Sequence, residues 1–344
     1  MISKVLKWIF IIVLLIGLAG CYTVYMLALK PNVNLHANEE GFLYIKTGST
    51  YADVIQQLNS QHLLKSTKTF DWLARFKKYD NKVKPGRYAF NSKQNNQDII
   101  NMLRSGNQSP VKLAFNNIRT KQQLAGIVSQ KIEADSTKLL QLLNDSAFIS
   151  LQGFNRYNIM ALFIPNTYEF YWNTSADKFI SRMHKEYDSF WNPMRMQQAA
   201  NAGLKPVDVI TLASIVQEET QMPADRPVIA GVYINRIKKN MPLEADPTLK
   251  FALNNFAIKR LLNEDKKVES PYNTYKYAGL PPGPINLPAI PYIDAVLNYT
   301  KHNYLFFCAR EDLSGYSNFA QTYAQHLVNA RKYQAELNRR NIKR

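Results

Sequence analysis

The chain has 344 residues, which is enough for two compact domains and an anchoring segment. Hydrophobic residues make up 46% of it and aromatic residues 12%, a composition typical of a folded protein that argues against disorder. The formal net charge of +17 favours polyanionic surroundings such as nucleic acid, anionic lipid or an acidic wall polymer. The charge does not choose among these, and a basic solvated surface explains it equally well.

An uncharged apolar run, Trp8–Leu29, stands near the N-terminus, and about 20 such residues suffice to cross a bilayer. Lys4 and Lys7 precede the run, so the positive-inside rule predicts residues 1–7 in the cytoplasm and the rest of the chain outside. A cleaved signal peptide is one alternative, and lipoprotein processing at Cys21 is another. Because the run stays apolar past Cys21, we expect an uncleaved single-pass anchor in the cytoplasmic (inner) membrane.

The cysteines and histidines exclude several classes of site. Cys21 lies in the apolar run and Cys308 is the other cysteine, so no disulfide within a domain is expected. The five histidines are scattered, and no Cys/His spacing resembles a metal site. The sequence also lacks a glycine-rich phosphate loop and a Gly-x-Ser-x-Gly motif. We therefore expect no metal and no organic cofactor.

The pattern after the anchor alternates short strands with helices. A polar linker is expected at residues 30–40. The apolar spacing and boundary residues predict strands at 41–46, 86–90 and 111–115, and helices at 51–58, 67–76, 96–104 and 119–132. Units of this kind often form binding modules, and a plain spacer is an equal alternative. We expect a small α/β module over residues 41–108.

The larger domain, expected over residues 109–344, is mainly helical. An aromatic stretch at 163–172 interrupts the helical pattern of 136–202 and suits either a buried core or, less commonly, a sugar-stacking wall. The elements predicted next are helices at 206–220 and 227–239, loops at 240–248 and 270–291, a hairpin of 304–309 with 316–319, and a basic C-terminal helix. The fold class is therefore α+β, with a small β element in the helical domain.

The helix expected at 206–220 ends in two adjacent glutamates that are not equivalent. At about 100° per residue, Glu219 falls inside the apolar stripe that includes Leu212 and Ile215. Glu218 falls on the margin of the stripe and is most simply a solvated flank residue.

An acid on a buried stripe has a predictable chemistry. Burial disfavours the charged carboxylate, so the pKa of Glu219 should rise. A carboxyl group that is still protonated near neutral pH is what general-acid cleavage of a glycosidic bond requires. The alternative is an ion pair with Arg226 or Arg236 that only tethers helices.

The loop at 270–291 combines tyrosine, asparagine and proline in a way that suits sugars. Tyr272-Asn-Thr-Tyr275 and Tyr277 offer amide and hydroxyl groups beside aromatic rings, and Gly279-Leu-Pro-Pro-Gly-Pro284 stiffens the loop. Rings stack on the apolar face of a sugar, and a stiff loop lowers the cost of ordering on binding. A plain structural cover is an equal alternative.

Five short motifs then occur in an informative order. They are Ala213-Ser-Ile-Val-Gln-Glu-Glu-Thr220, Val232-Tyr-Ile-Asn-Arg236, Ala245-Asp-Pro-Thr248, Tyr272-Asn-Thr-Tyr275 and Gly279-Leu-Pro-Pro-Gly-Pro-Ile285. Together with the upstream Pro165-Asn-Thr-Tyr-Glu-Phe170 and the N-terminal anchor, they resemble the endolytic murein transglycosylase (YceG-like) family over nearly the whole chain. Any one motif would be a weak signal, and five in order are a strong one.

The resemblance implies a membrane-anchored lytic transglycosylase that acts on nascent peptidoglycan strands, with a LysM-like module at 41–108 and a catalytic domain at 109–344. The family's essential acid, the second of an Ile-Val-Glu-x-Glu-Thr pattern, corresponds to Glu219. Three departures stand out: Gln217 replaces the first acid, Leu287-Pro-Ala289 replaces an Asn-Pro-Gly, and Gln325-His-Leu327 replaces a Glu-His-Asn. Proteins of wall synthesis or division are expected partners by analogy.

The implied mechanism uses one carboxyl group twice, first as an acid toward the bond between N-acetylmuramic acid and N-acetylglucosamine and then as a base. Asn235, Asn273 and Tyr275 are the expected substrate contacts, and Glu169 is a candidate substrate residue or second acid. A catalytically silent, membrane-anchored peptidoglycan-binding scaffold is the main alternative. A nucleic-acid binder is disfavoured because the sequence has no basic recognition helix or nucleic-acid motif.

Overall fold

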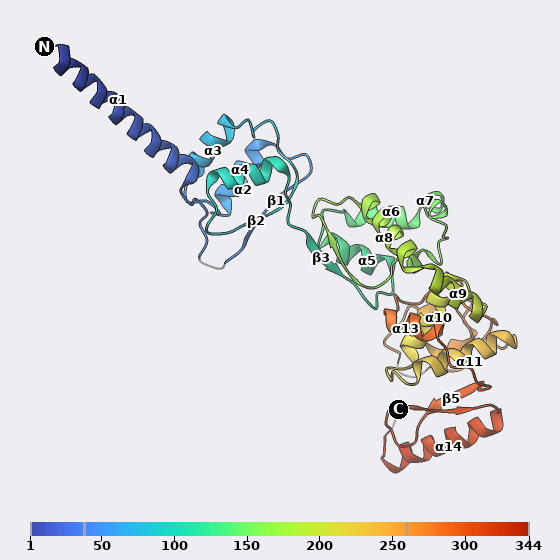
Figure 1. Cartoon of the computed structure of the whole chain (residues 1–344). Helices are drawn as coiled ribbons and strands as arrows, with labels where there is room; N and C mark the ends of the chain where they lie inside the picture. The colour runs from blue at the N-terminus through green and yellow to red at the C-terminus, as the bar shows by residue number, and fades with distance from the viewer. Residues whose placement is uncertain (1, 37–38, 259–260, 343–344) are drawn as a thin grey trace. The chain divides into compact units, whose positions relative to one another are not determined.

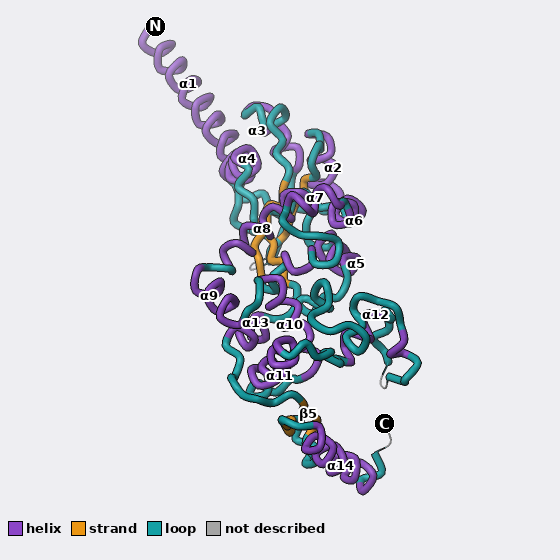
Figure 2. Tube along the Cα trace, turned by 90° about the vertical axis from the view of Figure 1, so that its right-hand side faces the viewer, coloured by secondary structure: helices purple, strands orange, loops and turns teal. Residues whose placement is uncertain are grey.

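The computed structural model describes residues 2–36, 39–258 and 261–342 (Figure 1). The chain divides into two compact units, of which the first holds residues 1–113, 130–134 and 169–175, and the second holds 114–129, 135–168 and 176–344. Helices dominate the described part of the chain, and its strands pair two by two (Figure 2). The expected α+β class, mainly helical with small β elements, is confirmed at this level.

A long apolar helix begins the first unit. Helix α1 (Ile2–Val24) continues into the π-helical turn η1 (Tyr25–Leu29), and the segment Val5–Leu29 is long and apolar enough to cross a membrane. The pair α9 (Pro193–Ala202) and α10 (Pro206–Glu219) passes the same test only as a span bent by 73°. Since α10 is buried inside the second unit, α1 is the span candidate among the described helices.

The rest of the first unit follows the order strand, helix, helix, strand, helix. Strands β1 (Gly41–Ile45) and β2 (Gly86–Phe90) pair antiparallel, with Gly41 opposite Phe90. The helices are α2 (Tyr51–Ser60), α3 (Thr67–Phe76) and α4 (Asn96–Ser105). Buried side chains from every one of these elements form one core.

Local chemistry sets the helix boundaries in this unit. Thr50 and Asp53 form a capping box at the start of α2, and Asn95 and Asp98 form another at the start of α4. Such boxes satisfy the free N–H groups of the first turn. Gly106 ends α4 in the left-handed conformation that favours glycine.

Two features of this region are not evident from the sequence pattern. The segment expected as a linker is packed, since Val33 is fully buried and forms a bridge with Leu64. The third strand, β3 (Val111–Ala114), pairs with β4 (Thr167–Phe170) and not with the β1–β2 sheet. The partner strand therefore comes from the aromatic stretch, whose Phe163 and Phe170 are buried as core residues.

The second unit surrounds α10. Helices α5 (Lys121–Ser129), α6 (Ser136–Asn144), α7 (Ser146–Leu151), η2 (Ile159–Leu162) and α8 (Ala176–Phe190) precede α9. All residues of α10 from Val209 to Gln217 are buried, because the helix is apolar on all sides and packs against α11 (Arg226–Lys238) and α13 (Ile290–Leu297). The element that ends in Glu219 is thus the central helix of this unit.

The remaining elements of the unit cover the C-terminal end of α10. Helix α12 (Asp246–Ala252) contacts α10, and η3 (Asp265–Lys267) follows it. Strands β5 (Phe306–Ala309) and β6 (Ser317–Ala320) form the expected hairpin, against which α14 (Tyr323–Arg339) packs. Helices α12 and α13 begin inside segments that the sequence pattern predicts as loops.

Candidate active site

Glu219 is the last residue of α10, and its half-buried side chain lines a cavity of about 420 Å³. Thr220 adopts an extended conformation and ends the helix there. The negative end of a helix dipole disfavours a carboxylate beside it. The other lining residues come from α11, α12, α14, β5 and the loops between them: Tyr233, Arg236, Leu243, Glu244, Asp246, Lys266, Tyr275, Leu305, Phe306, Phe307, Tyr323 and His326.

Tyr233 on α11 holds the carboxyl group directly. Its hydroxyl donates a hydrogen bond of 2.9 Å to Oε1 of Glu219, and its ring is buried edge-on against Phe307. Burial and the neighbouring carboxyl raise the pKa of Tyr233 well above its usual value. The tyrosine therefore remains a proton donor at neutral pH.

The pKa of Glu219 is raised from 4.5 to about 7. Burial is the main cause, and the negative charges of Asp246 and Glu218 add to it. The Tyr233 hydrogen bond and the positive charge of Lys250 act in the opposite direction. A substantial fraction of the protein thus carries a protonated Glu219 near neutral pH, as the position of this residue on the apolar stripe predicts.

A second acid and a second tyrosine stand on the same cavity wall. The hydroxyl of Tyr275 donates a hydrogen bond to Oδ1 of Asp246, the first residue of α12. Burial and Asp246 raise the pKa of Tyr275. The side chain of Asp246 is therefore held in place by a phenol, close enough to influence the pKa of Glu219.

The arginines that the ion-pair alternative invokes contact other groups. Nη1 of Arg236 pairs with Glu244 at 2.9 Å and also donates to the carbonyl oxygen of Leu243. Arg226 donates to the carbonyl oxygen of Gln221 and lies over the ring of Tyr292. Glu219 is tied to a neutral tyrosine, which lets its proton come and go without breaking a salt bridge.

Glu218 has a different environment from its neighbour. Both of its carboxylate oxygens accept hydrogen bonds of 3.1 Å from Arg119, and Oε1 also accepts one of 2.7 Å from Asn286. Its side chain is 25% exposed. The expectation of a solvated flank residue is therefore wrong, because the margin of α10 faces the segment that leads into α13. A carboxylate paired in this way is a tether between segments.

Gln217 stands where the Ile-Val-Glu-x-Glu-Thr pattern has its first acid, and its contacts show what this side chain does here. Its side chain is buried, and Oε1 accepts a hydrogen bond of 2.7 Å from the N–H of Ala289, the N-cap residue of α13. The amide therefore supplies the acceptor that the first turn of α13 needs. An uncharged side chain suffices for that role.

The other residues singled out from the sequence are spread over the structure. Tyr275 lines the cavity. The side-chain amide of Asn235 donates to the carbonyl oxygens of His302 and Tyr304. The fully buried Asn273 fastens the loop before Tyr275 by donating to two carbonyl oxygens, those of Lys266 and Val268. Both asparagines hold loops and are not among the cavity-lining residues.

Glu169 lies on β4, at an exposed position that belongs to the first unit. It is not among the residues that line the cavity around Glu219. In the described part of the chain, no three His, Cys, Asp or Glu side chains converge in a way that could hold a metal ion.

Sequence reasoning missed Tyr233 and Asp246, although both lie inside motifs that it quoted. Tyr233 stands 14 positions after Glu219, on the next helix, and its contact depends on how α10 and α11 pack. The available signal was a tyrosine among the apolar residues of α11, since a buried phenol needs a hydrogen-bond partner.

Comparison with known proteins identifies a family and several relatives to which this chain is similar. A sequence model of the YceG-like family matches residues 43–332. The endolytic murein transglycosylase of Bacillus subtilis is 29% identical over 308 residues, covering 84% of this chain and 83% of that protein. The endolytic murein transglycosylase of Streptococcus pneumoniae strain D39 is 27% identical over 332 residues, covering 87% of this chain and only 60% of that longer protein.

A solved structure is also similar to this chain. The crystal structure of a YceG-like protein from Listeria monocytogenes aligns with a TM-score of 0.56 and 25% identity, covering 85% of this chain and 99% of that one. The family match spans most of the chain and includes α10, α11, α12 and the β5–β6 hairpin. The protein belongs to the YceG-like family.

Proposed function

We propose that this protein is a lytic transglycosylase of peptidoglycan. It would cleave the β-1,4 bond between N-acetylmuramic acid and N-acetylglucosamine within nascent glycan strands. The observation that carries the proposal is the carboxyl group of Glu219, half-buried on a cavity wall with a pKa of about 7. The names of the relatives, both endolytic murein transglycosylases, support the substrate and the reaction.

In the first step the protonated Glu219 donates its proton to the oxygen that links the two sugars. The glycosidic bond breaks, the N-acetylglucosamine leaves with the donated proton on its O4, and positive charge develops on the N-acetylmuramic acid ring. The acidic side chain of Asp246, on the same wall, favours that charge electrostatically. The hydrogen bond from Tyr233 stabilises the carboxylate that Glu219 has become.

In the second step the ionised Glu219 takes a proton from the C6 hydroxyl of the same N-acetylmuramic acid. The oxygen closes on C1 and leaves a 1,6-anhydro end. The carboxyl group is protonated again, and no water is consumed, so the reaction is a lyase reaction. A pKa near neutrality suits a group that must give up and regain one proton in each cycle.

The cavity offers groups that suit a glycan. Tyr275, Tyr323 and Phe306 provide aromatic rings, and Lys266 and His326 provide polar groups. Tyr275 is the proposed substrate contact with direct support from the cavity. Asn235 and Asn273 support the site by fixing loops, and a contact of either asparagine, or of Glu169, with the glycan stays a prediction.

The first unit supports an uncleaved anchor. The amide of Asn96 donates a 2.7 Å hydrogen bond to the carbonyl oxygen of Leu27, and Ala28 is buried in the core of the unit. Cleavage after Leu27 would remove these contacts, whereas processing at Cys21 would leave them in place. Because the segment stays apolar past Cys21, we propose a single-pass protein of the cytoplasmic membrane, with residues 8–29 in the bilayer, residues 1–7 in the cytoplasm and the remainder outside.

The proposed domains are a short linker at 30–40, a LysM-like module at 41–108 and a catalytic domain at 109–344. The order strand, helix, helix, strand from β1 to β2 supports the module. Peptidoglycan strands are the proposed partner, together with proteins of wall synthesis or division.

The test compares the full-length wild type with Glu219→Gln and Glu218→Gln on purified peptidoglycan. Mass spectrometry should find 1,6-anhydro ends with wild type and Glu218→Gln, and a loss of roughly 10²–10⁴-fold with Glu219→Gln. In water enriched in oxygen-18 the new ends should carry no label, whereas a hydrolase would incorporate it. No release by wild type above a protein-free control would support the alternative, a silent peptidoglycan-binding scaffold, and equal release above that control by wild type and Glu219→Gln would remove Glu219 as the catalytic acid.

A further inference from the structure

Two large aromatic rings stand exposed on helix α3 of the first unit. Trp72 is 54% exposed and Phe76 is 73% exposed, and their rings stack with centroids 5.7 Å apart. The core side of the same helix consists of Phe70, Leu73 and Ala74. The exposed pair is therefore a second apolar face that the unit itself does not cover, and such faces mark contacts with a partner or a membrane.

Basic side chains frame this face. Lys68 lies one helical turn before Trp72 on the same stripe and is exposed, as are Lys65 and Lys78 at the two ends of the helix. An aromatic pair framed by lysines suits a surface that is apolar at one depth and negatively charged at the next, which is the headgroup region of a lipid bilayer.

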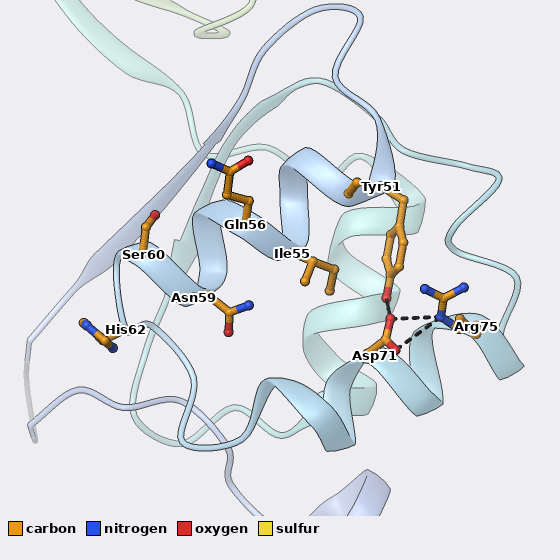
Figure 3. Close-up of a pocket in the computed structure, with 9 residues that line it drawn as sticks. Tyr51, Ile55, Gln56, Asn59, Ser60, His62, Asp71 and Arg75 are labelled. Atoms are coloured by element: carbon orange, nitrogen blue, oxygen red, sulfur yellow. Dashed lines mark hydrogen bonds and ion pairs between the residues drawn. The ribbon is translucent and has the colours of Figure 1, made fainter.

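Arg75 does not belong to this basic frame, because Asp71 neutralises it. Figure 3 shows Arg75 and the hydroxyl of Tyr51 meeting at the carboxylate of Asp71, at 3.0 and 2.7 Å. These contacts stand in a groove of about 750 Å³ between α2 and α3. They fix α3 against α2, so the aromatic face keeps its orientation in the unit.

The face lies next to the end of the apolar helix. The side-chain amide of Asn96 donates to the carbonyl oxygen of Leu27 at 2.7 Å and to Oγ1 of Thr69, in the first turn of α3, at 3.1 Å. Trp72 follows Thr69 by three residues, which is about 4.5 Å along the helix. Figures 1 and 2 both show α3 beside the point where α1 ends.

The length of the apolar segment sets the depth in the membrane at which Leu27 lies. Val5–Leu29 has 25 residues, which at ~1.5 Å per residue is about 37 Å. That length exceeds the hydrocarbon core of ~30 Å and falls short of the ~40–45 Å of the whole bilayer. If α1 spans the membrane, Leu27 and the neighbouring turn of α3 therefore lie at the level of the lipid headgroups.

We infer that Lys68, Trp72 and Phe76 contact the outer surface of the bilayer that α1 spans. The first unit then rests on the membrane and does not swing freely on its anchor. This inference rests on the proposed anchor. It adds a lipid-binding face on α3, with anionic phospholipid as the ligand, and it confines the first unit to the layer next to the membrane.

The experiment uses the full-length chain with Cys21→Ser and Cys308→Ser, reconstituted in vesicles that contain anionic lipid. An environment-sensitive fluorophore is attached through Lys68→Cys, or as a control through Lys46→Cys. Lys46 is exposed and follows β1, and Figure 1 shows the β1–β2 sheet on the side of the unit away from α1. Brominated lipids then quench any fluorophore that lies in the interface.

The label at position 68 should emit at shorter wavelength than the label at 46, and brominated lipid should quench it more strongly than the label at 46. Adding Trp72→Ser and Phe76→Ser should abolish this difference while α1 still resists alkaline extraction. An integrated protein with equal quenching at both positions would overturn the inference alone. A protein released at alkaline pH would contradict the anchor and with it this inference. A blue-shifted label in isolated cell membranes, but not in pure lipid, would assign the face to a membrane protein instead.

Discussion

The phenolic hydroxyl of Tyr233 donates a 2.9 Å hydrogen bond to Oε1 of Glu219, joining α11 to the last residue of α10. This bond and the burial of Glu219 act on the same proton in opposite directions. Burial keeps the proton on the carboxyl group, and the phenol stabilises the ionised form that follows its departure. The balance between the two leaves the pKa of Glu219 near neutrality.

Removing that hydrogen bond should move the pH profile. Tyr233→Phe takes away a contact that favours the ionised carboxylate, so the pKa of Glu219 should rise further. Because the protonated form begins the reaction, the alkaline limb of kcat/KM should move to higher pH. Tyr292→Phe is the matched control, since its hydroxyl contacts Thr220 and Gln221 and not Glu219. An unmoved limb in Tyr233→Phe would show that this bond does not set the titration.

Removing the neighbouring negative charge should have the opposite effect. Asp246 raises the pKa of Glu219, and Asp246→Asn keeps an acceptor for Tyr275 while removing the charge. The alkaline limb of kcat/KM should then move to lower pH, because losing the negative charge favours the ionised form of Glu219. Lys250→Met removes an opposing positive charge and should move the limb upward. Limbs that move in the same direction in both variants would refute the electrostatic account.

Glu219 should also make stability depend on pH. Its pKa is higher in the folded protein than in the unfolded chain, so the folded state binds the proton more tightly between about pH 4.5 and 7. The contribution of this group to stability is therefore full below pH 4.5 and is lost as the pH rises through 7. Glu219→Gln should raise Tm relative to wild type at pH 8 and leave it nearly unchanged at pH 4. A difference in Tm that is equal at both values would argue against a raised pKa.

The Arg119–Glu218 pair should contribute to stability and not to chemistry. Arg119→Ala leaves a carboxylate that is 25% exposed and whose remaining hydrogen-bond partner among the described residues is Asn286, which should cost roughly 1–3 kcal/mol in urea unfolding. Lys267→Ala, which breaks the exposed pair with Glu264, is the control and should cost under about 0.5 kcal/mol. If the two variants lose equal stability, Glu218 is not the tether that its contacts indicate.

Gly231 in α11 should tolerate no side chain. A Cβ there would collide with the carbonyl oxygen of Thr300 and the ring of His302, both in the segment that precedes β5. Gly231→Ala should therefore lower stability by about 1–3 kcal/mol, as overpacking does. Gly126→Ala in α5 meets open space and should be neutral or stabilising by up to about 1 kcal/mol. Thermal unfolding of the two variants decides the point, and a stable Gly231→Ala protein would contradict the close packing.

Local signals in the sequence predict most of the elements. The helix at 67–76 and the strand at 86–90 match the structure to the residue, because their apolar spacing is strong and polar caps or glycine mark their ends. Helix α13 escapes such reasoning because it begins inside a proline-rich segment that reads as a loop and because its N-cap, Ala289, has no capping side chain. The acceptor it needs comes from Gln217, 72 residues earlier in the chain.

The candidate site could be predicted only in part for a similar reason. The helical wheel finds Glu219 because one helix carries both the apolar stripe and the acid. It cannot find Tyr233 or the role of Asn273, since those depend on how separate segments pack. It also misplaces Glu218, because a wheel shows the margin of a helix but not the Arg119 and Asn286 that lie against it.

The titration of Glu219 in the folded protein tests the central claim most directly. Carboxyl resonances from protein labelled with carbon-13 in glutamate, compared between wild type and Glu219→Gln, isolate the signal of this one group. The account predicts a midpoint near pH 7, as burial raises the pKa to about 7. A midpoint close to 4.5, the ordinary value for glutamate, would mean that no protonated acid awaits the glycan at neutral pH and would contradict the mechanism.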